Sequence, residues 1–126
     1  MQCANPYNVY KQNSINMASK ESLLIMLADA TVRCTKIARK AIEDRNIQLA
    51  HKELTRVQDI YIELMATLNM DGGDFTKDLY KLYEFVKDKL YEANIKKDVV
   101  IIDEVMPIIE EIRNMWHEAI KLADAK

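Results

Sequence analysis

The sequence predicts an all-α protein, an antiparallel up-down four-helix bundle with a short additional N-terminal helix. Three observations lead to this fold class. The chain of 126 residues holds two prolines and two glycines, the glycines adjacent, which is too few for the turns of a β-sandwich or barrel. Long stretches repeat apolar residues at steps of three and four, as a helix does. The breaks between these stretches are short, so consecutive helices should fold back on each other.

The N-terminal helix is predicted from residues that favour a helix start. Asn5 is a good N-cap, and Pro6 follows at the first helical position, where its missing N–H costs nothing. One face of this helix then carries Tyr7, Tyr10, Ser14 and Met17. Its apolar content is thin, so the helix must dock on the rest of the chain. We expect a single domain over residues 1–126, in which residues 1–18 cap a bundle formed by residues 19–123.

The first helix of the bundle is predicted to begin at Ser19, a favourable N-cap, with Glu21 near the positive end of the helix dipole. Its apolar seam contains Leu23, Leu27, Ala30, Cys34, Ile37 and Ala41. The polar run at residues 44–46 breaks this helix. The second seam contains Ile47, Ala50, Leu54, Val57, Tyr61, Leu64 and Leu68. That second helix stops at the turn of residues 69–73.

The third helix of the bundle is predicted to be capped by Asp74 and to end around Asn94. Its seam contains Leu79, Tyr83, Val86, Leu90 and Ala93. Short connections of this kind place neighbouring helices antiparallel.

The last helix is predicted to be capped by Asp98. Its seam contains Ile102, Val105, Ile109, Ile112, Trp116, Ala119 and Ala123. Pro107 interrupts this helix. Because a proline removes one backbone hydrogen bond and crowds the carbonyl of Asp103, we expect a kink near Met106.

Charge and cysteine content exclude several classes of function. The net charge of −2 is unfavourable to nucleic-acid binding, which usually needs a basic face. The longest apolar runs, such as residues 99–102, are too short to span a bilayer, and the N-terminus lacks the pattern of a secretory signal. Cys3 and Cys34 are far apart and fit reduced thiols. We expect a cytoplasmic protein with no nucleic-acid partner and no membrane insertion.

The sequence also lacks the motifs of bundle enzymes. A di-iron site needs a glutamate three positions before a histidine, and Gln48 and Asn114 stand there before His51 and His117. A calcium loop that starts at Asn69 needs glycine at its sixth position and glutamate at its twelfth, and Asp74 and Tyr80 stand there instead. We therefore expect no catalytic residues, no metal site and no cofactor.

Several apolar residues lie outside the four seams. Ile101, Ile108, Met115 and Leu122 recur every seven residues beside the last seam. Ile25 and Val32 lie roughly opposite the seam of their helix, and Leu49 and Ile60 are also off-axis on theirs. These rows either complete a broad core, as is common in bundles, or line a groove for an amphipathic helix of another chain.

The residues resemble the FliS family, the flagellin export chaperones. The similarity is carried by residues 5–14 (NPYNVYKQNS), Ala18 and Ser19 before Leu23, residues 26–29 (MLAD), residues 79–83 (LYKLY), residues 93–98 (ANIKKD), and Trp116 with Ala119 and Ile120. It runs from about residue 5 to residue 120, nearly the whole chain. The order and spacing of these motifs together make the resemblance fairly specific.

The chain departs from the family pattern at a few positions. Lys20 stands where proline is common, and Ala28 and Ala30 replace the usual tyrosine and glycine. Pro107 is also unusual. Because the tyrosine is missing, no contact of the family at Ala28 is carried over to this chain.

The resemblance implies a cytosolic chaperone that binds the disordered C-terminal amphipathic segment of flagellin, prevents its premature polymerisation and aids its delivery to the flagellar type III export apparatus. It also implies an antiparallel helical bundle whose N-terminal segment lies across the bundle near the client site. Under this interpretation, export-gate components or a co-chaperone are further possible partners of the chain. The competing hypothesis is a self-associating helical structural or adaptor protein with no flagellin client.

Client binding is predicted for two tyrosines of the N-terminal segment and for residues of the extra apolar rows. These residues are Tyr7, Tyr10, Ile25, Val32, Ile60, Ile101, Ile108 and Met115. The two tyrosines act either as apolar plugs with hydroxyls at the rim or as anchors that fix the short helix to the bundle.

Overall fold

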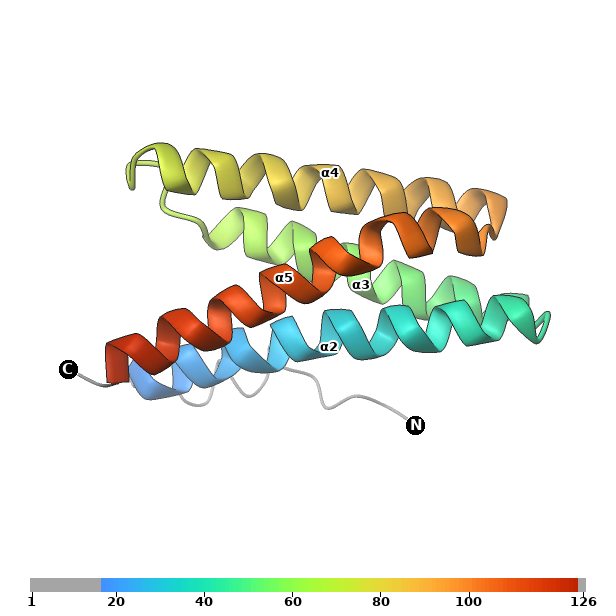
Figure 1. Ribbon diagram of the computed structural model, residues 1–126, viewed down its shortest axis with the longest axis horizontal. Coiled ribbons are helices and arrows are strands. Elements are labelled where there is room, and N and C mark those ends of the chain that lie inside the picture. The colour runs from blue at the N-terminus through green and yellow to red at the C-terminus, as the bar shows by residue number, and fades with distance from the viewer. Residues whose placement is uncertain (1–16, 125–126) are drawn as a thin grey trace.

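The computed structural model describes residues 17–124, which form four helices and confirm the all-α four-helix bundle (Figure 1). The helices are α2 (Met17–Glu43), α3 (Ile47–Thr67), α4 (Asp74–Lys96) and α5 (Val99–Asp124). The predicted N-terminal helix and its cap on the bundle lie outside the described residues. Among the described helices, α2 and α4 each contact α3 and α5, whereas the pairs α2/α4 and α3/α5 lie diagonally across the core. Each helix therefore has two neighbours.

The predicted cap at Asp98 is confirmed as a local hydrogen bond, and the start of α4 differs from the prediction. Asp98 Oδ1 accepts a hydrogen bond from the amide of Val100 at 2.9 Å and so caps α5. The break at residues 44–46 also supplies a cap, because Asn46 Oδ1 accepts from the amide of Leu49 at 3.2 Å. In contrast, Gly73 is the N-cap of α4, with φ of 91°, and Asp74 is the first helical residue. A positive φ favours glycine, which explains why the N-cap of α4 is Gly73 and not Asp74, the residue after it.

Two further helix ends differ from the prediction by two to three residues. α2 begins at Met17, so Ser19 lies inside the helix rather than at its start. α4 extends to Lys96 and ends at Lys97 in the left-handed conformation, whose amide donates to the carbonyl of Ala93. A left-handed residue that satisfies a terminal carbonyl is a common helix end.

α5 is continuous from Val99 to Asp124 with Pro107 inside it. Pro107 lies on the exposed side of the helix. The carbonyl of Asp103, one turn earlier, loses its usual amide donor on that side, where water can replace the donor. The position of the proline thus lets the helix continue past it.

The core joins a helix face of small residues to two large aromatic rings. The inward face of α2 is made largely of buried small residues: Ala28, Ala30, Thr31, Cys34, Thr35, Ala38 and Ala41. Tyr61 of α3 and Tyr83 of α4 are completely buried, with ring centroids 5.6 Å apart. Thr31 Oγ1 donates to the carbonyl of Ala28, and Thr35 Oγ1 to that of Thr31, each at 2.6 Å. These bonds satisfy the two hydroxyls, so threonine can take part in the apolar interior.

Candidate functional site

The predicted client-binding residues fall on different edges of the bundle. Tyr7 and Tyr10 lie outside the described residues. The six others lie on three helices: Ile25 and Val32 on α2, Ile60 on α3, and Ile101, Ile108 and Met115 on α5. Hydrogen bonds between helices show which neighbouring helix each edge of α3, α4 and α5 faces, and so where these six residues lie.

One edge of α5 faces α2 and carries polar side chains. Asp103 of α5 bonds to Arg39 of α2, and His117 of α5 bonds to Asp29 of α2 at 2.7 Å. Ile108 lies nine positions before His117, which is about two and a half turns and places it on the opposite side of the helix. The row that includes Ile108 and Met115 therefore faces α4.

The edge of α4 that faces α5 is identified in the same way. Asn94 of α4 bonds to His51 of α3 through Nδ2 and Nδ1, 3.1 Å apart, so this edge of α4 faces α3. Phe85 lies nine positions before Asn94 and is on the opposite side. Leu82 and Phe75 precede Phe85 along the same edge. These three side chains keep 45%, 37% and 62% of their surface exposed, for Phe85, Leu82 and Phe75 respectively.

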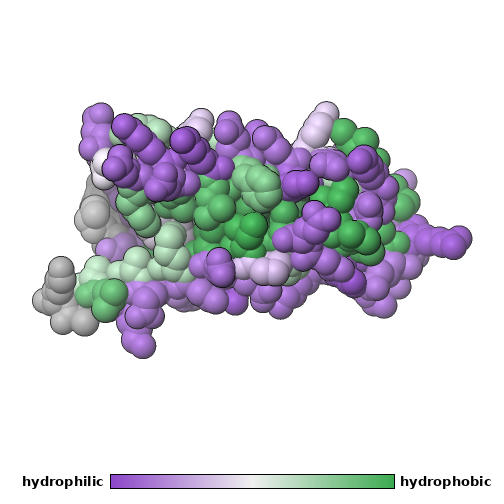
Figure 2. Space-filling view, turned by 45° about the horizontal axis from the view of Figure 1, so that its top comes forward, coloured by the Kyte–Doolittle hydropathy of each residue, from purple (hydrophilic) through white to green (hydrophobic). Residues whose placement is uncertain are grey.

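An apolar surface, which we call the α4–α5 face, is formed where these two edges meet. Its residues are Phe75, Leu82 and Phe85 of α4 with Ile108, Met115 and Leu122 of α5. Leu122 is 59% exposed, whereas Ile108 and Met115 are partly buried and pack against the core. Figure 2 turns the upper side of Figure 1, where α4 lies, towards the viewer and shows a band of hydrophobic side chains between hydrophilic margins.

A hydrogen bond between aromatic side chains joins α4 to α5 beneath this face. Trp116 Nε1 donates to the hydroxyl of Tyr83 at 2.7 Å. Burial raises the pKa of Tyr83 to about 12, against the opposing effect of the bond from Trp116. The hydroxyl therefore stays neutral near pH 7, and the floor of the face is uncharged.

Three of the predicted residues belong to the core. Val32, Ile60 and Ile101 are 4%, 7% and 6% exposed. Val32 lies roughly opposite the predicted seam of α2, as expected, but it is buried, so that side of the helix is packed as well. Asp29, three positions earlier on the same edge, bonds to His117, so this edge packs against α5. A bundle helix with two neighbours needs two apolar edges, and the predicted seam covered one of them.

Ile25 and Ile60 lie on edges other than the α4–α5 face. Ile25 is partly buried and lies one turn before Asp29, on the edge of α2 that faces α5. Ile60 lies nine positions after His51, so it points away from α4 and towards α2. The structure therefore brings together Ile101, Ile108 and Met115, and separates them from Ile25, Val32 and Ile60. Whether any of these residues contacts a client stays a prediction.

Sequence reasoning missed the contribution of α4 to this face. Phe75, Leu82 and Phe85 lie outside the seam of their helix, at spacings of seven and three residues. That spacing was the available signal, because residues seven apart lie nearly above one another on a helix. The row was not recognised because lysine and acidic residues separate its members in the sequence.

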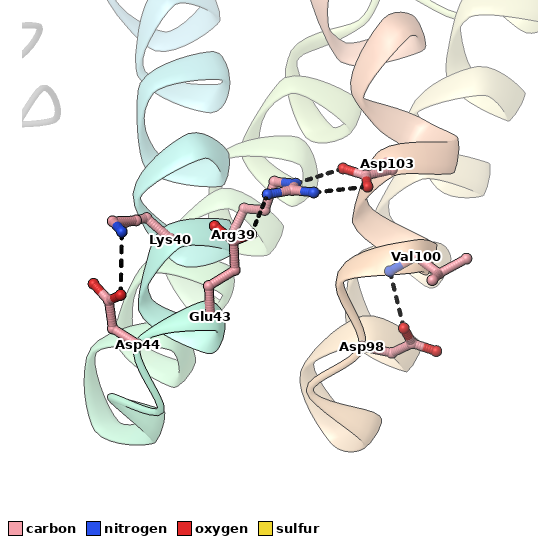
Figure 3. A network of polar contacts seen from close by, with 7 residues as sticks. All are labelled: Arg39, Lys40, Glu43, Asp44, Asp98, Val100 and Asp103. Atoms are coloured by element: carbon pink, nitrogen blue, oxygen red, sulfur yellow. Dashed lines mark hydrogen bonds and ion pairs between the residues drawn. The ribbon is translucent and has the colours of Figure 1, made fainter.

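The opposite edge of α5 is held by an ion pair between the first and last described helices (Figure 3). Arg39 Nε and Nη2 donate to the two carboxylate oxygens of Asp103 at 2.6 and 3.0 Å, and Glu43 pairs with Nη1 of the same guanidinium at 3.0 Å. The hydrogen bonds from Arg39 hold the pKa of Asp103 below its usual value. This edge is therefore engaged within the chain.

Neither a metal-binding cluster nor a membrane-spanning helix is found among the described residues. Residues 17–124 contain no group of three or more histidine, cysteine, aspartate or glutamate side chains placed to hold a metal ion. None of the four helices is both long and apolar enough to cross a membrane. The α4–α5 face is a feature of this part of the chain that is suited to a partner.

Comparisons with known proteins give one consistent family. Residues 3–123 match the model of the family described as flagellar protein FliS. The chain is 31% identical over 121 residues to a Bacillus subtilis protein named flagellar secretion chaperone FliS, covering 96% of this chain and 90% of the relative. A Vibrio cholerae protein of the same name is 32% identical over 107 residues, covering 84% of this chain and 79% of the relative. The protein of that name from Campylobacter jejuni is 30% identical over 113 residues, which cover 89% of this chain and 88% of the relative.

Proposed function

This chain belongs to the FliS family of flagellar proteins, and from that premise we propose that it is a flagellar secretion chaperone whose client is flagellin. It binds the disordered C-terminal amphipathic segment of flagellin on the α4–α5 face. By covering that segment it prevents premature polymerisation in the cytoplasm. It then aids delivery of the client to the flagellar type III export apparatus.

The observation that carries this proposal is the exposure of large apolar side chains beside a core that is already filled. On the inner side of α4, the side chains of Tyr83, Val86 and Leu90 are completely buried. Phe75 and Phe85 of the same helix remain 62% and 45% exposed. A contiguous apolar surface of this kind on a soluble protein marks an interaction site.

An amphipathic helix is the partner that suits such a surface. A segment that is disordered when free can fold as it binds and lay its apolar side between two helices of the chaperone. Ordering the segment offsets part of the gain from burial, so the complex can be reversed at a later step. A chaperone that must release its client at the export apparatus needs this property.

The role is one of binding, and it requires no residue that makes or breaks a covalent bond. Membership of a chaperone family supports a non-enzymatic protein. Export-gate components or a co-chaperone are proposed as further partners, on surfaces separate from the client.

The N-terminal segment is proposed to compete with the client or to be rearranged by it. Tyr7 and Tyr10 would then act as apolar plugs with hydroxyls at the rim. Deletion of residues 1–18 tests this part of the proposal through its effect on client affinity. An affinity equal to that of the intact chain would exclude competition by the segment.

Calorimetric titration of the intact chain with a flagellin C-terminal segment tests the main proposal. Phe85→Asp should weaken binding by at least about tenfold, because it places a charge in the centre of a buried apolar contact. Ile62→Asp is the matched control, since Ile62 is 52% exposed on α3 and lies outside the face. Equal affinities of the two variants, with both folded by circular dichroism, would refute the assignment to this face.

Self-association is the alternative function that the same surface allows. In that case the α4–α5 face would be covered by a second copy of the chain, and the flagellin segment would not bind. The mass in solution separates these possibilities. A concentration-dependent dimer that Phe85→Asp dissociates would favour the alternative.

A further inference from the structure

An unpaired row of carboxylates borders the α4–α5 face along α5. Glu104, Glu111 and Glu118 are exposed and recur every seven residues, so they follow one line along the helix for about 21 Å at 1.5 Å per residue. Each lies four positions before a residue of the apolar row, which contains Ile108, Met115 and Leu122, and is therefore next to that row. The carboxylates form one margin of the face.

The charges of this row are not balanced within the described part of the chain. Arg39 pairs with Asp103, and within residues 17–124 the side chains of the three glutamates take part in no ion pair or hydrogen bond. α5 holds six acidic residues against two basic ones, although the whole chain has a net charge of only −2. The negative charge of the protein is thus concentrated on the helix that borders the face.

The margin along α4 is different. Its charges are of both signs, and several are paired on the helix itself: Lys89 and Lys96 both contact Glu92, at 3.9 and 3.2 Å. The two margins of the face are therefore electrostatically unequal, and a helix lying between them can distinguish one side from the other.

We propose that the α4–α5 face selects an amphipathic helix with a row of lysine or arginine residues along one edge of its apolar side, and that this edge lies over Glu104, Glu111 and Glu118. The inference rests on the proposed function and adds to it the chemistry of the client helix and its orientation on the face. The apolar side chains supply the burial. The carboxylate row sets which way the helix is rotated and speeds its encounter with the chaperone.

Exposed charge pairs have a recognisable signature. Each contributes little to affinity, and salt screens it over about 8 to 10 Å. Three pairs in line should together change affinity by about tenfold at low salt, and by much less at high salt. The salt dependence of binding is therefore the readout that separates the carboxylate row from the apolar contacts.

The test uses the intact chain and two synthetic peptides of 21 residues, which share one leucine row and carry either lysine or glutamate at every seventh position beside it. The lysine peptide should bind about tenfold more tightly at low salt. The triple variant E104Q/E111Q/E118Q should remove that preference. The control variant D59N/E63Q/E84Q makes the same change in net charge at exposed positions of α3 and α4 and should keep the preference.

Failure of this inference can be told apart from failure of the proposed function. If the two peptides bind equally, or if the two triple variants behave alike, the carboxylate row has no role in selection. If the flagellin segment nevertheless binds to the intact chain and Phe85→Asp weakens it, the proposed function stands alone. If the intact chain binds neither the flagellin segment nor the lysine peptide, both are refuted.

Discussion

The two edges of α5 show how one helix can serve both the fold and a partner. The edge towards α2 carries Asp103 and His117, which bond to side chains 64 and 88 positions away in the sequence. The edge towards α4 carries Ile108 and Met115 beside exposed apolar side chains of α4. Polar groups on the first edge find their partners within the chain. The second edge has apolar surface left over, and this difference marks the side on which a client should bind.

The largest expected loss of stability comes from the core side of α5, which lies between its two edges. Ile109 is completely buried, so Ile109→Ala should lower the free energy of unfolding by about 3 kcal/mol. Leu122→Ala, on the exposed part of the α4–α5 face, should change it by less than about 0.5 kcal/mol. Urea denaturation followed by circular dichroism measures both. Similar losses for the two variants would contradict the separation of core from face.

Alkaline pH should destabilise the fold through the buried tyrosines. Burial raises the pKa of Tyr83 to about 12 from an unfolded value of 10.0, and burial raises that of Tyr61 further. The unfolded chain therefore loses its phenol protons first, and stability falls as pH rises from about 10 towards 12, by about 2 to 3 kcal/mol for Tyr83. Denaturation at pH 9 and pH 11.5 measures this loss, and Tyr83→Phe should reduce it. An equal loss in that variant would assign the effect to other groups.

A smaller effect is expected for the bond beneath the α4–α5 face. Trp116→Phe removes the N–H that the hydroxyl of Tyr83 accepts. It should lower the free energy of unfolding by about 1 to 2 kcal/mol, because the buried hydroxyl loses its partner. The double variant with Tyr83→Phe provides the check, since removing both groups should restore part of the lost stability. Additive losses would show that the two side chains act independently.

The smallest effect should come from the opposite edge. Asp103 has a lowered pKa because Arg39 donates hydrogen bonds to its carboxylate. The ion pair therefore adds stability above the ordinary aspartate pKa of about 3.9, and this contribution disappears as pH falls and the carboxyl gains a proton. The melting temperature of Asp103→Asn should lie slightly below that of the unmodified chain at pH 7, and the two should converge near pH 2. Client affinity at neutral pH should be unchanged.

Sequence reasoning predicted the fold well where side chains are large. All five seam residues predicted for α4, from Leu79 to Ala93, are buried. On α2 the seam identified Ala30, Cys34 and Ala41 but missed Thr31, Thr35 and Ala38. Threonine does not register as apolar in a periodicity count. Its burial depends on a hydroxyl bond to a carbonyl of the previous turn, and a count of apolar residues does not include that bond.

The candidate site was predicted less completely. The row of Ile101, Ile108 and Met115 was identified from its spacing of seven residues. Its partner on α4 was not, because the face of Phe85 is defined only once α4 and α5 are placed side by side. Val32 and Ile60 were assigned to a binding surface because a one-dimensional pattern does not show that each helix packs on two neighbours.

The bonds between α2 and α5 also carry a consequence for the order of folding. Asp29 and His117 are separated by 88 positions, so their contact closes almost the entire chain into a ring of helices. The entropy lost in closing such a loop grows with its length, whereas the hairpins of α2 with α3 and of α3 with α4 close over short turns. The neighbouring hairpins should therefore form first, and the docking of α5 on α2 should complete the bundle. The contact between α2 and α5 would then be the last of the contacts between neighbouring helices to form.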